Sequence, residues 1–226
     1  DSAGTNTAIL KVAITDNGGY LNVRNWQMRD FFMWHNGGGK DGLYVGGGFP
    51  MLNSHVSGCQ IGSGTNGGYG LHDAISSHSE YSNCTFDYAF MECGDANVIR
   101  KCSFLGTGCA VTYDLAFGIR NNTVKDCTIV NRDGAVTILN GDNIRIENNQ
   151  IELAIGYTPP NNQSAASAFI WIVGSAGRSV NNTVIRANNF GGGTNLNHSI
   201  YVSYGYRAVI RENNFIATAE EDIYLS

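Results

Sequence analysis

Two six-residue segments, Val124-Lys-Asp-Cys127-Thr-Ile129 and Ile146-Glu-Asn-Asn149-Gln-Ile151, share one pattern. An apolar residue is followed by two mostly polar residues, then by a cysteine or asparagine, and a second apolar residue comes two positions later. We call the cysteine or asparagine the anchor. Anchors recur at residues 59, 84, 102, 127, 149, 188 and 213, with a degenerate copy at Trp26. Successive anchors lie 18 to 39 residues apart, and self-similarity of this kind is typical of a repeat protein.

A second short apolar segment accompanies each repeat. These segments lie at residues 43–45, 71–73, 90–92, 111–113, 136–138, 170–172, 200–202 and 223–225. The usual spacing is too short for a propeller blade of about 40–45 residues, and no segment carries helical periodicity over ten residues. The sequence therefore predicts an all-β fold, a right-handed parallel β-helix. It would be a single-stranded solenoid of about 8–9 coils, each strand pairing with its counterpart about 4.8 Å away.

The anchors should form one column along the solenoid. Stacked asparagines can hydrogen-bond their amides from coil to coil, and the cysteines would act as small buried apolar residues. Disulfides are an alternative, because the spacing between coils is permitted. Parallel stacking, however, holds Cβ atoms farther apart than the roughly 3.8 Å that a bridge prefers. We expect reduced thiols, which favour synthesis in a reducing cytoplasm.

Composition and charge narrow the function classes. The chain has a net charge of −5 and no evident basic stripe, so we expect no nucleic-acid partner. No apolar run approaches the roughly 18 residues of a membrane span, and the histidines lack metal-ligand spacing, so neither a membrane, a metal nor a cofactor is expected. Residues 1–226 read as one β-helix domain. Both ends read as open strands, which suggests a segment of a longer protein or ends covered by subunit contacts.

The anchor turns and the segment Asp41-Gly-Leu-Tyr-Val45 resemble the pectin-lyase-like β-helix superfamily, and within it phage tailspike and capsule depolymerase proteins. The resemblance extends from about residue 8 to residue 226. It implies a homotrimer in a virion tail, made in a bacterial cytoplasm, that binds a capsular polysaccharide or lipopolysaccharide. Secretion is the alternative location. The signature residues of polygalacturonases and pectate lyases are absent, so the resemblance specifies the fold far more strongly than the activity.

Long loops flank the second apolar segment, so they should surround its sheet and mark the functional face. The middle residues of these segments should point outward. We expect five aromatic side chains to line a sugar groove there: Tyr44, His72, Trp171, Tyr201 and Tyr204. Packing of these aromatics under loops or against a neighbouring subunit is the alternative.

Carboxylates on the middle coils are the candidate catalytic groups. Aligning Met91 with Val111 puts Glu92 and Asp114 on adjacent coils and two residues out of register, roughly 8 Å apart. That separation suits the acid and base of an inverting glycosidase. Asp73, one coil further toward the N-terminus, is held in reserve. It should point inward if Leu71 does, unless a bulge intervenes.

The leading hypothesis is a tailspike-like receptor-binding protein that binds a bacterial surface polysaccharide and hydrolyses it as an endo-acting glycosidase. A polysaccharide lyase is the first alternative. It would need a base such as His72 or Tyr113, and a cation such as Arg100 or Arg132 to neutralise a uronate. A non-catalytic receptor-binding or structural β-helix is the second alternative.

Overall fold

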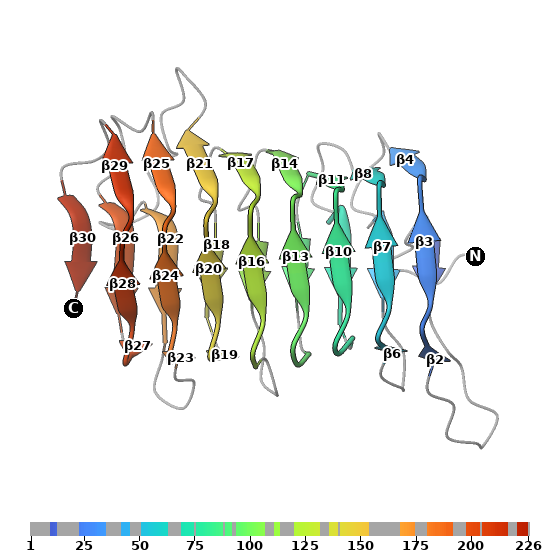
Figure 1. Cartoon of the computed structure of the whole chain (residues 1–226), viewed down its shortest axis with the longest axis horizontal. Helices are drawn as coiled ribbons and strands as arrows, with labels where there is room; N and C mark the ends of the chain where they lie inside the picture. The colour runs from blue at the N-terminus through green and yellow to red at the C-terminus, as the bar shows by residue number, and fades with distance from the viewer. Residues whose placement is uncertain are drawn as a thin grey trace, which may run out of the picture.

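The structure is a computed structural model that describes residues 10–12, 23–34, 42–45, 51–62, 69–74, 76–87, 89–91, 94–106, 111–113, 120–131, 136–139, 141–153, 168–174, 180–191, 198–203, 205–216 and 221–225. Within these residues there is no helix, and the strands stack into three long parallel sheets (Figure 1). The predicted parallel β-helix is confirmed. In Figure 1 the coils advance from right to left while the front strands run upward and the rear strands downward, so the helix is right-handed.

Each coil contributes one strand to each long sheet. Sheet A contains β1 (Leu10–Val12), β5 (Leu43–Val45), β9 (Leu71–Asp73), β12 (Ala89–Met91), β15 (Val111–Tyr113), β18 (Val136–Ile138), β22 (Ala168–Val173), β26 (His198–Ser203) and β30 (Glu221–Leu225). Sheet B contains β3 (Gln27–Arg29), β7 (His55–Ser57), β10 (Glu80–Ser82), β13 (Val98–Arg100), β16 (Thr123–Lys125), β20 (Arg145–Glu147), β24 (Val184–Arg186) and β28 (Val209–Arg211). Sheet C contains β4 (Phe32–Trp34), β8 (Gln60–Gly62), β11 (Thr85–Phe86), β14 (Ser103–Gly106), β17 (Thr128–Asn131), β21 (Gln150–Leu153), β25 (Asn189–Gly191) and β29 (Asn214–Ile216).

Two smaller sheets lie at the turn from sheet A to sheet B. One joins β19 (Gly141–Asp142), β23 (Val180–Asn181) and β27 (Gly205–Tyr206), and the other joins β2 (Val23–Arg24) to β6 (Met51–Leu52). The chain therefore passes from sheet A through this turn to sheet B, then through the anchor turn to sheet C, and returns to sheet A.

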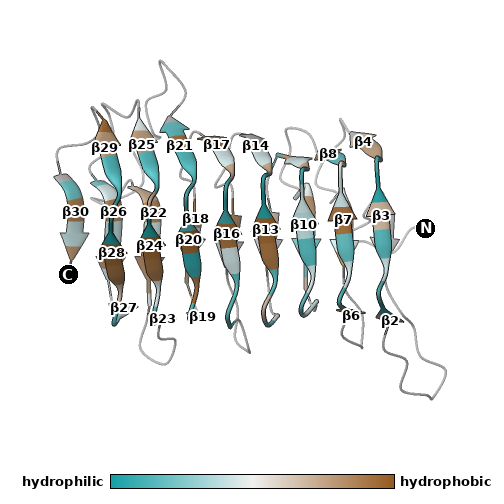
Figure 2. Ribbon diagram, viewed as in Figure 1, coloured by the Kyte–Doolittle hydropathy of each residue, from teal (hydrophilic) through white to brown (hydrophobic). Residues whose placement is uncertain are grey.

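The core follows from the alternation of side chains along each strand. Each strand of sheet B has a polar last residue, and its middle residue points into the core (Figure 2). Middle residues such as Ile99 and Val124 are apolar and buried. Equivalent positions meet in register across coils, so Phe86 packs on Phe104 and Phe190 stacks on Phe215, with ring centroids 5.8 and 5.1 Å apart. The interior is thus a set of stacked like side chains.

Two columns of tight turns set the coil geometry. The residue before each anchor adopts a left-handed backbone conformation, with φ between 52° and 63° from Asp30 to Glu212. A second column, at the turn into sheet B, runs from Asn25 to Arg207 with φ between 52° and 58°. Asparagine tolerates this conformation better than most residues, which explains its abundance at these turns.

The predicted anchor column from residue 59 to residue 213 is confirmed by hydrogen bonds between consecutive coils, such as Thr128 N to Cys102 O at 2.9 Å. The prediction of Trp26 as the first anchor was wrong. Gln60 N donates to Phe31 O, and Met28 pairs with Val56, so Phe31 and not Trp26 stands opposite Cys59. The segment around Trp26 was aligned wrongly because its apolar residues mimic the anchor pattern. It lies instead at the turn from sheet A into sheet B.

The asparagine anchors form a buried amide ladder. Asn188 Nδ2 donates to Asn213 Oδ1 at 3.0 Å and to Ile146 O at 2.9 Å, while its own Oδ1 accepts from the backbone N and the Nδ2 of Asn149. In the earlier coils the cysteine thiols point at the equivalent carbonyls. Cys127 Sγ lies 3.8 Å from Ile99 O. The thiol is a weak substitute for the amide, and the two residue types can therefore share one column.

The four anchor cysteines of the described chain, Cys59, Cys84, Cys102 and Cys127, are buried free thiols. The neighbouring Cys127 side chain, together with burial, raises the pKa of Cys102 to about 12. The adjacent Cys102 thiol and burial also raise the pKa of Cys84. Such thiols carry little thiolate at neutral pH, which is the reactive form.

We predict that Asn188→Ala lowers the free energy of unfolding by about 2–4 kcal/mol, because it leaves several buried partners unsatisfied. Asn188→Cys should cost clearly less, since a thiol fills this position in the preceding coils. Asn214→Ala is the control, because its exposed side chain makes one ladder contact, to Asn189. Urea denaturation measures all three, and equal losses for Asn188→Ala and Asn188→Cys would contradict the role assigned to the thiols.

We also predict that the four anchor thiols resist alkylation in the folded protein and react once the chain is unfolded. The reason is burial combined with a raised pKa. Iodoacetamide labelling near pH 8 with and without urea, followed by peptide mass mapping, gives the rate at each site. Rapid native labelling of Cys84 or Cys102 would show that the coils open readily.

Candidate functional site

One column of in-register residues runs through the middle of the sheet A strands. Its members are Tyr44, His72, Phe90, Thr112, Thr137, Trp171, Tyr201 and Tyr224. The middle positions expected from the sequence are confirmed in every coil but one. In that coil Phe90 holds the position expected for Met91 or Glu92, and Met91 is buried in the core.

Four rings gather over the last coils of this face, and we call Trp171, His198, Tyr201 and Tyr224 the aromatic cluster. Tyr201 and Tyr224 stack in parallel, with centroids 5.2 Å apart and planes 9° apart. His198 packs against both, 4.8 Å from Tyr224 and 5.7 Å from Tyr201. Tyr224 is 38% exposed and Trp171 and Tyr201 are half-buried, so the cluster borders solvent.

Trp171 differs from the tyrosines in orientation. Its ring centroid lies 6.4 Å from that of Tyr201, and the two planes are 70° apart. The tyrosines direct their ring faces at each other, whereas Trp171 and Tyr201 meet edge to face. Its Nε1 is buried and has no hydrogen-bond partner within the described part of the chain, a state that costs about 1–3 kcal/mol.

His72 does not lie open on the surface, which corrects the expectation for this residue. It is only 5% exposed, because Tyr44 and Tyr69 both pack edge-on against its ring, at 4.9 and 5.2 Å. Tyr44 itself is half-buried on the outer face. Two tyrosine rings therefore cover His72, and this burial makes it a poor candidate for the base of a lyase.

Asp73 is inside the coil, which corrects its reserve assignment as a catalytic carboxylate. It is fully buried beside Leu71, since no bulge interrupts β9. Tyr81 Oη donates to Asp73 Oδ2 at 2.6 Å, Ser76 N donates to Oδ1 at 2.9 Å, and the Ser76 hydroxyl also donates to Oδ2. The carboxylate thus ties sheet A to sheet B across the core. Burial, followed by the nearby Asp73 charge, raises the pKa of Tyr81 well above its usual value.

The proposed catalytic pair and one groove residue, Glu92, Asp114 and Tyr204, lie outside the described residues. The strands that precede Glu92 and Asp114 are described, and their register differs from the predicted one. Ala89 pairs with Val111, and Met91 pairs with Tyr113, so aligning Met91 with Val111 was wrong by two residues. The 8 Å separation derived from that alignment no longer has a basis. The small side chain of Ala89 occupies the first inward position, and this disguised the start of the strand.

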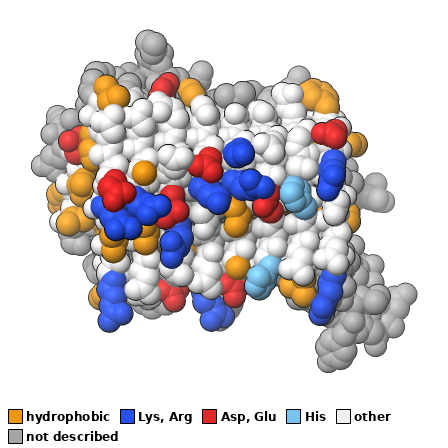
Figure 3. Space-filling model, viewed as in Figure 1, with side chains coloured by type: hydrophobic (Ala, Val, Ile, Leu, Met, Phe, Trp, Pro, Cys, Tyr) orange, Lys and Arg blue, Asp and Glu red, His pale blue; other side chains and the backbone are white. Residues whose placement is uncertain are grey.

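Charge concentrates on a different face. The outer column of sheet B brings Arg100, Lys125, Arg186 and Arg211 into register, with Glu147 between them (Figure 3). Glu147 lies 4.0 Å from Arg186, and Arg100 binds Glu80 at 2.7 Å. Burial by itself would raise the pKa of Glu80, but the hydrogen bonds from Arg100 and Ser82 and the charge of Arg100 together outweigh burial, so that pKa is lowered. Arg100 therefore faces away from sheet A and does not suit the lyase alternative.

The described ranges contain neither a metal-binding cluster nor a membrane-spanning helix. No three His, Cys, Asp or Glu side chains there are grouped to hold a metal ion. The same residues contain no helix long and apolar enough to cross a membrane.

Comparisons with known proteins add little beyond the architecture. No protein-family model matches the chain, and no curated protein matches it. A solved structure with a similar arrangement is PfbA, a surface adhesin of Streptococcus pneumoniae, at a TM-score of 0.42 and 10% sequence identity. The match covers 91% of this chain and 61% of that chain.

We predict that Tyr81→Phe destabilises the protein by about 1.5–3 kcal/mol, because it removes a donor to the buried Asp73 carboxylate. The effect should shrink at alkaline pH. A folded-state pKa above that of the unfolded chain contributes stability below about pH 10 and loses it as pH rises further. Urea denaturation from pH 8 to 11 tests this, with Tyr206→Phe as the exposed control. A constant difference between Tyr81→Phe and the parent across this range would contradict the assignment.

Proposed function

We propose that this chain is a receptor-binding β-helix whose sheet A face binds a bacterial surface polysaccharide. The observation that supports this most directly is the aromatic cluster at the solvent boundary of a regular parallel sheet. Aromatic rings with polar tips are suited to sugars, since the ring contacts the apolar C–H face and the tip meets hydroxyl groups. The resemblance to phage tailspikes extends the proposal to a trimeric tail protein.

The rings would take different parts in this binding. Trp171 would supply part of the stacking surface, since its side chain is half-buried at the solvent boundary. The parallel pair Tyr201 and Tyr224 would contribute phenol hydroxyls at a spacing of one coil, about 4.8 Å. Thr137 follows Trp171 in the column toward the N-terminus, so hydroxyl groups continue along the same line. A polysaccharide lying along the solenoid axis would meet this row in order.

Hydrolysis is the finer part of the proposal, and it rests on sequence. Glu92 and Asp114 directly follow Met91 and Tyr113, which pair on adjacent middle coils. A carboxylic acid and a carboxylate at a suitable distance would protonate the leaving oxygen and activate a water molecule. Glu92→Gln and Asp114→Asn should each abolish release of reducing ends and leave binding nearly unchanged. A lyase would instead add ultraviolet absorbance from an unsaturated sugar, and a pure adhesin would do neither.

We predict that Trp171→Ala weakens polysaccharide binding by tenfold or more, because truncating a central tryptophan anchor commonly costs about 2 kcal/mol. The measurement is biolayer interferometry against immobilised capsular polysaccharides and lipopolysaccharides. Phe32→Ala is the matched control, since Phe32 is an exposed aromatic residue (67%) on sheet C. Unchanged binding by Trp171→Ala, or an equal loss in Phe32→Ala, would remove the sheet A face as the binding surface.

A further inference from the structure

The outer face of sheet B gathers basic residues that are scattered along the sequence. The first and last residues of each strand flank the buried middle residue and point outward. These positions hold six of the 14 lysine and arginine residues of the chain but only two of its 19 aspartate and glutamate residues. The face therefore has a formal charge of +4, whereas the chain as a whole has −5. The six cations are Arg29, Arg100, Lys125, Arg145, Arg186 and Arg211, and the two acids are Glu80 and Glu147.

Register arranges four of these cations in two pairs. Arg100 on β13 lies beside Lys125 on β16, and Arg186 on β24 lies beside Arg211 on β28. Figure 3 shows two separate groups of basic side chains on this face. Glu147 on β20 stands midway between them, so the centres of the pairs are three coils apart, about 14 Å. We call them the two cationic pairs.

The fold itself does not require these charges. Like charges at directly opposed positions of neighbouring strands are destabilising. The same column holds Ser57 and Ser82 in earlier coils, so a small neutral side chain is compatible with the position. The cationic pairs therefore oppose local stability without serving the core, and departures of this kind are expected at functional sites.

Acidic residues compensate only one member of each pair. Glu80 lies 2.7 Å from Arg100, and Glu147 lies 4.0 Å from Arg186. Within the described residues, no ion pair engages the other member of either pair, and none engages the exposed Glu212 at the last anchor turn. Each pair therefore keeps one cation available to an anionic group.

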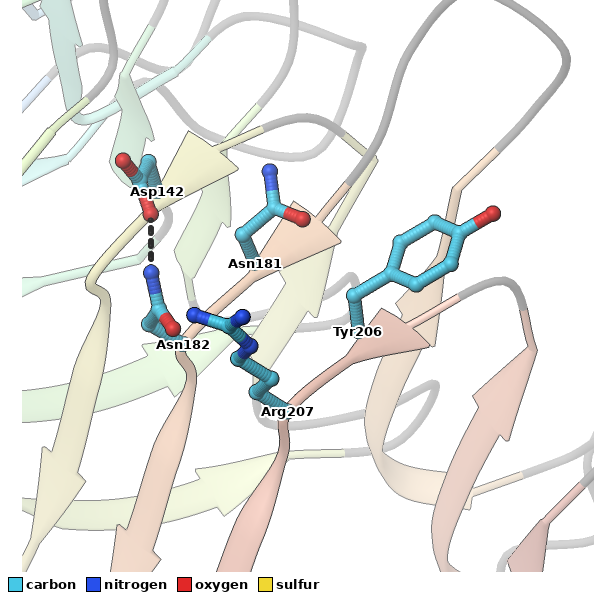
Figure 4. A pocket seen from close by; sticks show the side chains of 5 residues that line it. All are labelled: Asp142, Asn181, Asn182, Tyr206 and Arg207. Carbon is cyan, nitrogen blue, oxygen red and sulfur yellow. Dashed lines mark hydrogen bonds between the residues drawn. The ribbon is translucent and has the colours of Figure 1, made fainter.

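Acids at the turns that border sheet B are held by asparagines. Asn148 Nδ2 donates to Asp126 Oδ1 at 2.7 Å, and Asn182 Nδ2 donates to Asp142 Oδ1 at 2.9 Å. Figure 4 shows the second contact, in a shallow depression that Arg207 also lines. The edges of the basic face thus present amides beside the carboxylates, and amides form hydrogen bonds with sugar hydroxyls.

The composition of the face selects among anionic polymers. Its outward positions in the described strands carry no Phe, Tyr, Trp, Leu, Ile or Met. Single-stranded nucleic acids usually stack on aromatic rings, and membrane surfaces take up large apolar side chains. Duplex DNA carries about one charge per 1.7 Å of its axis, so its phosphates would also meet Glu147 between the pairs. A polysaccharide with widely spaced charges fits the face better.

The pairs are suited to an anion that lies within the polymer chain. A phosphodiester carries one negative charge and two free oxygens, so two cations on adjacent coils can both donate to it. Because it is part of the polymer backbone, it can lie against a flat sheet without a pocket. We infer that the outer face of sheet B binds a polysaccharide whose repeats are joined by phosphodiesters, with one phosphodiester at each cationic pair. This site is separate from the sheet A face and does not depend on it.

The test is biolayer interferometry with the full chain and an immobilised bacterial capsular polysaccharide whose oligosaccharide repeats are joined by phosphodiesters. The parent should bind, and its affinity should fall at least tenfold when the NaCl concentration rises from about 50 to about 300 mM, because exposed charges are screened. Arg186→Gln combined with Arg211→Gln should weaken binding at least tenfold at low salt. Lys125→Gln should weaken it severalfold. All three side chains lie at the surface, and thermal unfolding checks that the fold is retained.

Two variants are controls. Arg29→Gln combined with Arg120→Gln removes the same charge from exposed positions outside the pairs, and Trp171→Ala alters the aromatic cluster of sheet A. Both should bind as the parent does, so the result is independent of the proposed sheet A site. Absence of binding, an equal loss in the Arg29 and Arg120 variant, or loss in Trp171→Ala would each overturn the inference. So would equal or tighter binding of polygalacturonate, duplex DNA or phosphatidylglycerol vesicles.

Discussion

The whole structure depends on each coil repeating the last in register, and the two columns of left-handed turns enforce that register. A left-handed residue turns the chain sharply, and the residue after it is then held by hydrogen bonds to the coil on either side. Asn149, Asn188 and Asn213 make these bonds with amides that are largely or wholly buried. A buried amide without its partner would be costly, so a coil that slipped along its neighbour would lose several such bonds together.

Register converts a sequence pattern into surfaces. Positions that repeat along the chain become columns in space, and each column has the character of its residues. The inward columns become stacks of isoleucine, valine and phenylalanine, the outer column of sheet A becomes largely aromatic, and that of sheet B becomes largely basic. The variable spacing between anchors leaves these columns intact, because the extra residues fall between sheet C and sheet A or at the turn into sheet B.

The proposed polysaccharide face has its aromatic cluster in the last coils of the solenoid, on β22, β26 and β30. Near the other end of the solenoid Tyr44 and Tyr69 cover His72, and Asp73 accepts a hydrogen bond from Tyr81 within the core. The proposal therefore places recognition in the later coils.

The sequence alone determined the coil architecture, because a hydrophobic repeat with cysteine or asparagine at a fixed point has few other ways to bury its apolar residues. It also predicted the outer column of sheet A, since side chains alternate along a strand. The tertiary structure decided the strand alignments and the contacts between distant segments, which local sequence patterns do not determine. Register moved the first anchor to Phe31 and gave the middle position of β12 to Phe90 instead of Met91, because a short strand has several alignments that only packing against its neighbours can separate. Contacts between distant segments buried His72 and Asp73 and brought Asp142, Asn182 and Arg207 together, and no spacing along the chain encodes those contacts.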